Sequence, residues 1–278
     1  MEFVYSAKNP GAEAAFVSFG AMHSVFEMVL VGISEHKAES IAERVRLRVS
    51  SIEKKLNRHD SKSVFAGICS SGADTPVAVD DEVFSLLQFC ETFRKGTAGY
   101  FDIAVLSGSD VRPAYSLSPG TGTVSLAADD ILLDAGGFGK GYALDQIRTV
   151  LAEEGVENAL LNFGDSSVLG IGCHPFGDCW SVDVRTGGGT FRLKDSSLSV
   201  SGLRPDGTAH IVDPMEGTLV GFRGLVAVEG RSAFICEVLS TALYAAPERM
   251  RQAIISAFDG YSYKLIKQDV KQWIGENL

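Results

Sequence analysis

The sequence lacks any apolar run that approaches the roughly 18 residues of a membrane-spanning helix. Its start, MEFVYSAKNPGAEAAF, has no basic segment followed by an apolar run, so we expect no signal peptide and a cytoplasmic protein. Basic residues are outnumbered, at 25 against 35 acidic ones, and they form no run. The net charge of −10 makes nucleic acid and anionic membranes poor partners.

Cysteine is scarce, with five residues and no C-x-x-C pair. An odd number of cysteines without that spacing favours reduced thiols in a cytoplasmic protein. Cys173 and Cys179 flank His174, but two thiols and one imidazole leave a zinc site one ligand short. The sequence therefore does not predict a zinc centre.

Hydrophobic residues make up 45% of the 278 residues, which suits one large packed domain or two ordinary ones. Apolar spacing predicts helices over Lys37–Leu56, Asp80–Phe93, Tyr142–Glu154, Phe234–Ala245 and Glu248–Phe258. Short β-rich runs predict strands over Val25–Val31, Ala159–Asn162, Trp180–Val184, Thr190–Leu193, Ser197–Ser201, Ala209–Val212, Gly224–Val228 and Tyr263–Ile266.

Glycine and proline predict the connections between these segments. Gly187–Gly189 would join Trp180–Val184 and Thr190–Leu193 into a hairpin, and Gly108–Thr123 is predicted to be a loop. Helices and strands alternate without a strict β-α-β rhythm. This pattern predicts an α+β fold with mixed sheets and flanking helices.

The most informative stretch is Leu133–Asp145, with the sequence LDAGGFGKGYALD. The apolar run 130–133 predicts a strand end, the four glycines a turn outside helix and strand, and Tyr142 the start of a helix. Such a turn lets backbone approach a phosphate closely, although it can also be a tight connection without a ligand. Neither the Walker pattern nor the G-x-G-x-x-G spacing is present, since Lys140 precedes Gly141.

Glu237 and Thr241 lie four residues apart on a predicted helix, so both face the same side. A carboxylate beside a hydroxyl suits Mg²⁺, which prefers oxygen ligands. The alternative is a carboxylate that complements a helix dipole.

Three further side chains are candidate ligand contacts. His210 stands at a predicted strand end, Asp102 follows the turn at Gly99, and Lys140 lies in the glycine-rich block. Each also has an ordinary structural explanation: a hydrogen-bonded histidine, a turn aspartate and a solvated lysine.

Taken together, these segments resemble the ApbE-like FAD:protein FMN transferases, formerly described as thiamine-biosynthesis lipoproteins, from about Phe19 to Ile266. The matching segments, in the order of the family, are FGAMHSVFEMVLVG, GYFDIAV, LDAGGFGKGYALD, ALLNFGD, AHIVDPMEG and CEVLSTAL.

The resemblance implies a T-shaped α+β fold over 1–278, as one domain or two intertwined sub-domains, with an FAD cleft between the sub-domains. It implies that FAD is the substrate, that Mg²⁺ bridges its pyrophosphate, and that FMN passes to a Thr or Ser of an acceptor flavoprotein with release of AMP. It assigns no catalytic residue. The implied FAD contacts are Phe19, Tyr100, Phe101, Asp102, Asp134, Lys140, His210 and Ile211, and the implied metal ligands are the Gly137 carbonyl, Glu237 and Thr241.

The chain departs from the family pattern at several positions. Phe19 and Ala21 replace the opening Met and Thr, Cys69 a polar residue, Glu216 the Thr of Thr-Gly, and Glu237 the metal aspartate. Two alternative functions therefore stand beside the transferase. One is a catalytically impaired member that only binds flavin or acts as a binding module, and the other is an FAD hydrolase that releases FMN and AMP.

Overall fold

A computed structural model describes residues 1–9, 12–184, 188–204, 206–222 and 224–267 of the chain. The helices are α1 (Glu35–Leu56), α2 (Val64–Cys69), α3 (Asp81–Gly96), α4 (Gly139–Glu153), α5 (Ala233–Ala245) and α6 (Glu248–Ser256). Among the described residues, none of the helices combines the length and the apolar composition that a bilayer crossing requires.

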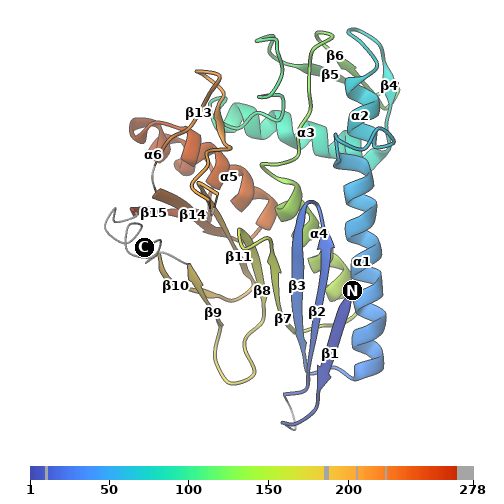
Figure 1. Ribbon diagram of the computed structural model, residues 1–278, viewed down its shortest axis with the longest axis vertical. Coiled ribbons are helices and arrows are strands. Elements are labelled where there is room, and N and C mark those ends of the chain that lie inside the picture. The colour runs from blue at the N-terminus through green and yellow to red at the C-terminus, as the bar shows by residue number, and fades with distance from the viewer. Residues whose placement is uncertain (10–11, 185–187, 205, 223, 268–278) are drawn as a thin grey trace.

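One eight-stranded sheet forms the centre of the molecule, in the order β1-β2-β3-β7-β8-β11-β14-β15 (Figure 1). Its strands are β1 (Glu2–Ser6), β2 (Ala14–Ala21), β3 (Ser24–Val31), β7 (Asn158–Phe163), β8 (Ser167–Ile171), β11 (Ser196–Gly202), β14 (Gly224–Gly230) and β15 (Ser262–Lys267). The smaller sheets contain β4 (Val77–Ala78), β6 (Thr123–Leu126) and β5 (Tyr115–Ser118); β9 (Trp180–Val184) and β10 (Gly189–Leu193); and β12 (Val212–Asp213) and β13 (Thr218–Leu219).

The α+β class is confirmed, but the sheets are not mixed in strand direction. Every strand pair within the described residues is antiparallel, and the parallel pairing is confined to an isolated bridge between Ala73 and Leu126. Tight reversals such as β2–β3 and β7–β8 make neighbouring strands antiparallel.

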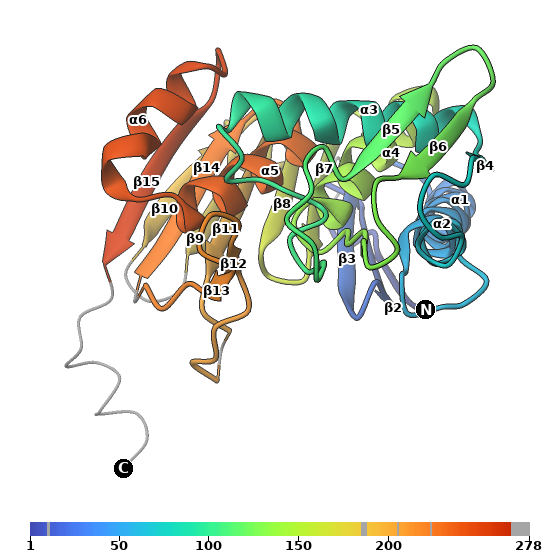
Figure 2. The same ribbon diagram turned by 90° about the horizontal axis from the view of Figure 1, so that it is seen from above.

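The two faces of the large sheet are covered differently. Along β11, Ser199 and Ser201 bind Ser240 of α5, whereas Leu198 packs with Trp180 of the β9–β10 hairpin. Since side chains alternate across a strand, helix α5 lies on one face and the hairpin on the other. Figure 2 shows α2 and the three-stranded sheet beside α1, with α6 and β15 at the opposite end.

The predicted helices are confirmed, with shifted ends. In α1 the apolar stripe from Ile41 to Leu56 is buried, and the helix begins two residues before the predicted Lys37. The Asp80 side chain caps α3 by accepting from the amide of Val83 at 2.8 Å.

Two expectations around the glycine-rich block are wrong. The segment 130–133 is not a strand, because the amides of Leu132, Leu133 and Asp134 donate to Ser107 Oγ, Cys69 Sγ and the Ile103 carbonyl instead of to a neighbouring strand. Helix α4 begins at Gly139, not at Tyr142, so two of the glycines are helical.

Two further predictions change and a third is confirmed. Gly108–Thr123 is not all loop, because Tyr115 pairs with Leu126 and both side chains are buried. The strand predicted over Ala209–Val212 shares only Val212 with the observed β12, Val212–Asp213. The hairpin of Trp180–Val184 with Gly189–Leu193 is confirmed, although Gly187 lies outside the described residues.

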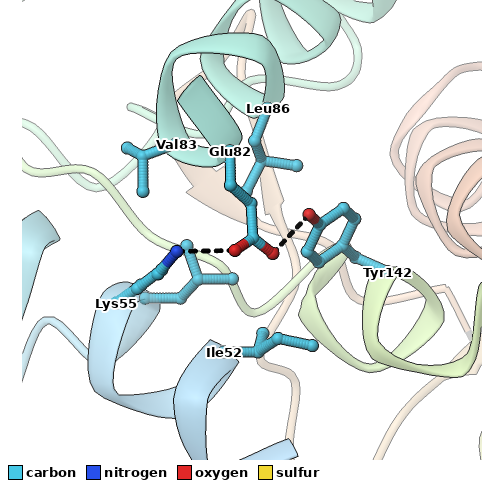
Figure 3. Close-up of a pocket in the computed structure, with 7 residues that line it drawn as sticks. Ile52, Lys55, Glu82, Val83, Leu86 and Tyr142 are labelled. Atoms are coloured by element: carbon cyan, nitrogen blue, oxygen red, sulfur yellow. Dashed lines mark hydrogen bonds and ion pairs between the residues drawn. The ribbon is translucent and has the colours of Figure 1, made fainter. Parts of the chain in front are cut away.

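Helix α3 is joined to α1 and α4 by a cluster around Glu82 that borders a small hollow (Figure 3). The Glu82 carboxylate accepts from Arg48 Nη2 at 2.5 Å, Lys55 Nζ at 2.6 Å and the Tyr142 hydroxyl at 2.7 Å. Burial alone would raise the pKa of Glu82, but these hydrogen bonds outweigh it and lower the pKa to about 2. Tyr142 of the glycine-rich block therefore holds α4 against α3.

We expect Glu82→Gln to lower the free energy of unfolding by about 1–2 kcal/mol at pH 7. The carboxylate contribution is complete above pH 4.5, the ordinary pKa, and disappears as the pH falls towards 2. Urea titrations from pH 7 to pH 2.5 should show the two proteins converging in acid. Glu43→Gln, at an exposed ion pair with Arg46, is the control and should match the parent; a constant difference across this pH range would contradict the assignment.

Candidate functional site

The start of α4 crosses the start of α5 at very close range. A Cβ atom on Gly141 would lie 2.3 Å from the Ala233 carbonyl oxygen and 3.0 Å from the Phe234 Cα atom. Only glycine permits this approach without displacing backbone. Gly141 therefore sets the distance between the two helices.

The last residue of the glycine-rich block anchors α5. One Asp145 oxygen accepts from the Ala233 amide at 3.0 Å, and the other accepts from the Phe234 amide at 3.1 Å and from the Ser232 hydroxyl. These amides belong to the first turn of α5, where no intrahelical acceptor is available. Asp145 thus positions the helix that presents Glu237 and Thr241.

Glu237 points from α5 to the N-terminus of α4 and is 4% exposed. Its Oε1 accepts from Lys140 Nζ at 2.5 Å, and its Oε2 accepts from the Gly141 amide at 2.5 Å. A negative charge at a helix N-terminus is favourable. Glu237 therefore complements the dipole of α4, a different helix from its own.

Thr241 lies one turn further along α5, beside Gly137. A Cβ on Gly137 would be 3.3 Å from Thr241 Cγ2 and 3.5 Å from Thr241 Oγ1. The structure thus brings together Gly137, Lys140, Glu237 and Thr241, which are up to 104 positions apart, from Gly137 to Thr241 (241 − 137 = 104).

These residues fit a hard divalent cation in donor type. Carboxylate, hydroxyl and carbonyl oxygens are what Mg²⁺ prefers, and Glu237 and Thr241 face the same turn. Across the described part of the chain, no three His, Cys, Asp or Glu side chains are close enough together to hold a metal. A cation here would depend on backbone and hydroxyl oxygens beside one carboxylate, and that carboxylate already has the Lys140 ammonium as its partner.

The amides of the turn are largely used within the protein. Gly136 donates to Asp134 Oδ1 at 2.8 Å, Phe138 and Gly139 donate to the Ala135 carbonyl, and Gly141 donates to Glu237. The turn therefore offers a phosphate fewer amide donors than its glycine content suggests.

Asp134 is held by Arg58, which sequence reasoning missed. The Arg58 guanidinium pairs with Asp134 Oδ2, and both side chains are about a quarter exposed, at 28% and 26%. Arg58 follows α1 in the segment NRHD, and no pattern in the sequence links it to Asp134.

Asp102 is likewise engaged by the protein. Its Oδ1 accepts from the Ala104 amide at 2.8 Å, and Oδ2 pairs with Arg112, which was also missed. Phe101 is 3% exposed and lies against Gly137, while Tyr100 is half-buried between two parts of the core. Of these three predicted FAD contacts, Phe101 is buried, and Tyr100 and Asp102 are partly exposed.

His210 is exposed and lies near Lys140 and Arg204. Desolvation by the surrounding protein lowers the pKa of His210, and the positive charges of Arg204 and Lys140 lower it further. Ile211 packs on the core of α5 and α6. The following turn reaches the Asp102 segment, since Met215 Cε lies 2.6 Å from where a Gly99 Cβ would stand.

One predicted FAD contact and two positions that depart from the family pattern remain, namely Phe19, Cys69 and Glu216. Phe19 is 9% exposed and packs on Phe26 with ring centroids 4.9 Å apart. Cys69 Sγ accepts from the Leu133 amide at 3.2 Å, and burial raises the pKa of this thiol. Glu216 is exposed in the β12–β13 turn.

Two hollows in the described part of the chain include no predicted site residue. One is the Glu82 cluster of Figure 3, and the other is lined by Asp195, Ser196, Glu229, Gly230, Arg231, Gly260 and Ser262. The FAD cleft between the sub-domains stays a prediction.

Comparison with solved structures identifies the fold. The flavin transferase ApbE from Vibrio cholerae superposes with a TM-score of 0.76 at 18% identity, covering 92% of this chain and 97% of that one. The ApbE protein from Thermotoga maritima gives 0.77 at 22% identity, covering 93% and 98%. The chain has the fold of the ApbE flavin transferases.

The sequence comparisons agree. Proteins named FAD:protein FMN transferase from Klebsiella pneumoniae (strain 342) and Treponema pallidum (strain Nichols) are 25% and 24% identical, over 227 and 270 residues. The matches cover 68% and 77% of this chain and 69% and 72% of the relatives. A sequence model of the ApbE family matches residues 22–263, and the chain belongs to that family. The prediction of a transferase enzyme is confirmed.

Proposed function

We propose that the protein is a Mg²⁺-dependent FAD:protein FMN transferase. It cleaves the FAD pyrophosphate and attaches FMN to a Thr or Ser of an acceptor flavoprotein. The observation that supports this most is the meeting of the glycine-rich block with α5, where Gly137, Lys140, Glu237 and Thr241 lie together in a chain of the ApbE family.

The reaction balances without an oxidant or reductant. The acceptor hydroxyl oxygen forms a bond to the FMN-side phosphorus, and the bond from that phosphorus to the bridging oxygen breaks. AMP leaves with the bridging oxygen, and the hydroxyl proton is released. The acceptor becomes an FMN phosphoester.

The chain must bind an anionic pyrophosphate although its net charge is −10. Lys140, Arg204 and His210 supply local positive charge or hydrogen-bond donors at the glycine-rich block. A bound Mg²⁺ would neutralise charge that develops on the pyrophosphate, held by Glu237, Thr241 and the Gly137 carbonyl. Asp134 and Asp102, each paired with an arginine, border this region without adding unpaired negative charge.

The test is direct. Purified protein is incubated with FAD, Mg²⁺ and candidate acceptor flavoproteins; AMP is measured by chromatography and the acceptor by intact mass spectrometry. A mass increase of one FMN unit, with equimolar AMP, is the expected result. AMP with free FMN and an unmodified acceptor would indicate the hydrolase instead.

A flavin-binding member without turnover is the second candidate, favoured by the ion pair that already neutralises Glu237. Fluorescence titration with FAD separates the possibilities. Binding without AMP release supports this second candidate, and no FAD binding contradicts both the transferase and the hydrolase.

We expect Thr241→Val to reduce AMP release about tenfold or more, because one hydroxyl ligand of the cation is lost while side-chain shape is kept. The unfolding midpoint should stay close to that of the parent. Thr92→Val, on the exposed side of α3 away from the site, is the matched control and should keep full activity. Equal rates for both variants would show that Thr241 has no part in the reaction.

A further inference from the structure

The Lys140–Glu237 pair is a buried ion pair at the candidate cation site. The Glu237 side chain is 6% exposed and the Lys140 side chain 21% exposed. Their contact of 2.5 Å leaves no room between the two charged atoms for another ion. The second Glu237 oxygen is bound to the Gly141 amide, so both oxygens have partners.

A divalent cation at Glu237 must therefore replace the ammonium group. Two cations sharing one buried carboxylate oxygen would repel each other strongly in the low-dielectric interior. The Gly141 amide is neutral and can remain. Lys140 is on a flexible four-carbon stem, whereas Glu237 is fixed by the amide it accepts from.

The surroundings allow the Lys140 side chain to move away from Glu237. Its stem passes Gly164, since Lys140 Cδ lies 3.5 Å from where a Gly164 Cβ would stand, and its exposed part borders solvent. His210 lies close enough to feel the charges of both Lys140 and Arg204. A displaced ammonium group would add to the positive charge that faces the pyrophosphate.

We infer that Lys140 is a built-in competitor of the divalent cation: it neutralises Glu237 in the metal-free protein, and cation binding releases its ammonium group. The inference rests on the cation site of the proposed function. The apparent cation affinity is then the intrinsic affinity multiplied by the fraction of metal-free molecules in which Lys140 is detached; if that fraction is about a tenth, binding is about tenfold weaker.

The first experiment uses the unmodified protein without FAD. An amine-reactive reagent is applied with and without Mg²⁺, at concentrations that saturate the site in a parallel Mn²⁺ titration, and lysine labelling is quantified by peptide mass spectrometry. Labelling of Lys140 is expected to rise several-fold with the cation. Lys55 is the matched control, because it is also ion-paired and is 23% exposed, and its labelling should not change.

The second experiment measures Mn²⁺ binding by electron paramagnetic resonance in Lys140→Gln, Lys55→Gln and Glu237→Gln. We expect Lys140→Gln to bind Mn²⁺ about tenfold or more tightly than the parent, Lys55→Gln to match the parent, and Glu237→Gln to lose binding. Circular dichroism checks the fold of each variant. If Lys140→Gln does not fold, the labelling experiment decides alone.

The inference is overturned if Lys140 labelling is unchanged at saturating cation, if Lys140→Gln binds no more tightly than the parent, or if Mn²⁺ binds to neither protein. These readouts need neither FAD nor an acceptor. Exchange of Lys140 without AMP release would reject the transferase while keeping the competitor role. AMP release with unchanged Lys140 labelling would support the transferase and reject the competitor role.

Discussion

Replacing Gly141 with alanine is expected to destabilise the protein by about 3 kcal/mol or more, or to prevent folding. The added methyl group would stand 2.3 Å from the Ala233 carbonyl oxygen and 2.7 Å from its carbon. Both are backbone atoms of the α5 N-terminus, so no side-chain rotation relieves the overlap. Helix α5 would have to move away, which also breaks the Glu237 contact with the Gly141 amide.

Gly67→Ala provides the matched control. Gly67 is also helical, in α2, but its added Cβ would meet no atom within 4 Å. Alanine favours helix over glycine by about 0.8–1.0 kcal/mol, so this variant should be as stable as the parent or slightly more stable. Urea unfolding followed by tryptophan fluorescence measures both. Equal stability of the two variants would show that the α4–α5 crossing tolerates a wider spacing.

Asp145→Ala is expected to cost about 2–3 kcal/mol of unfolding free energy and to reduce activity. The substitution removes three acceptor contacts, to the Ala233 and Phe234 amides and the Ser232 hydroxyl. It also removes a negative charge from the positive end of the α5 dipole. Because α5 presents Glu237 and Thr241, a loosened N-terminus also weakens the geometry of the candidate cation site.

Asp145→Asn separates the hydrogen bonds from the charge. The amide oxygen can still accept one of the two backbone amides, so we expect about half the loss seen with alanine. Thermal unfolding by circular dichroism, with AMP release measured on the same samples, tests the series. Equal losses for asparagine and alanine would show that charge alone matters; no loss in either would remove Asp145 as the anchor of α5.

Local sequence patterns predicted the structure correctly wherever that structure depends on a single segment of the chain. The apolar stripe of α1 buries one helix face, and its spacing is visible in the sequence. The two β-rich runs Trp180–Val184 and Thr190–Leu193, with glycines between them, likewise predict the observed hairpin. The i, i+4 spacing of Glu237 and Thr241 places both on one side of α5 without any knowledge of its neighbours.

Local sequence patterns gave the wrong secondary structure where it depends on contacts with a distant part of the chain. The run 130–133 has the composition of a strand, yet the amides of Leu132, Leu133 and Asp134 bind to three separate groups outside any strand. Gly139 and Gly141 favour a turn by propensity, but both lie in the first turn of α4, where Gly141 contacts α5 closely and donates to Glu237. Tertiary contacts overrode the local preference in both cases.

By itself, the sequence determined the α+β class, the order of the family's segments and the side of α5 on which the candidate ligands lie. The tertiary structure decided what those ligands touch. Lys140, Arg58 and Arg112 lie 97, 76 and 10 residues from the carboxylates of Glu237, Asp134 and Asp102. Whether such distant side chains pair depends on their charges and on the distance between them in the folded chain. This pairing produces no periodicity in the sequence. Only the fold therefore shows that the carboxylate beside the glycine-rich turn is bound to a lysine.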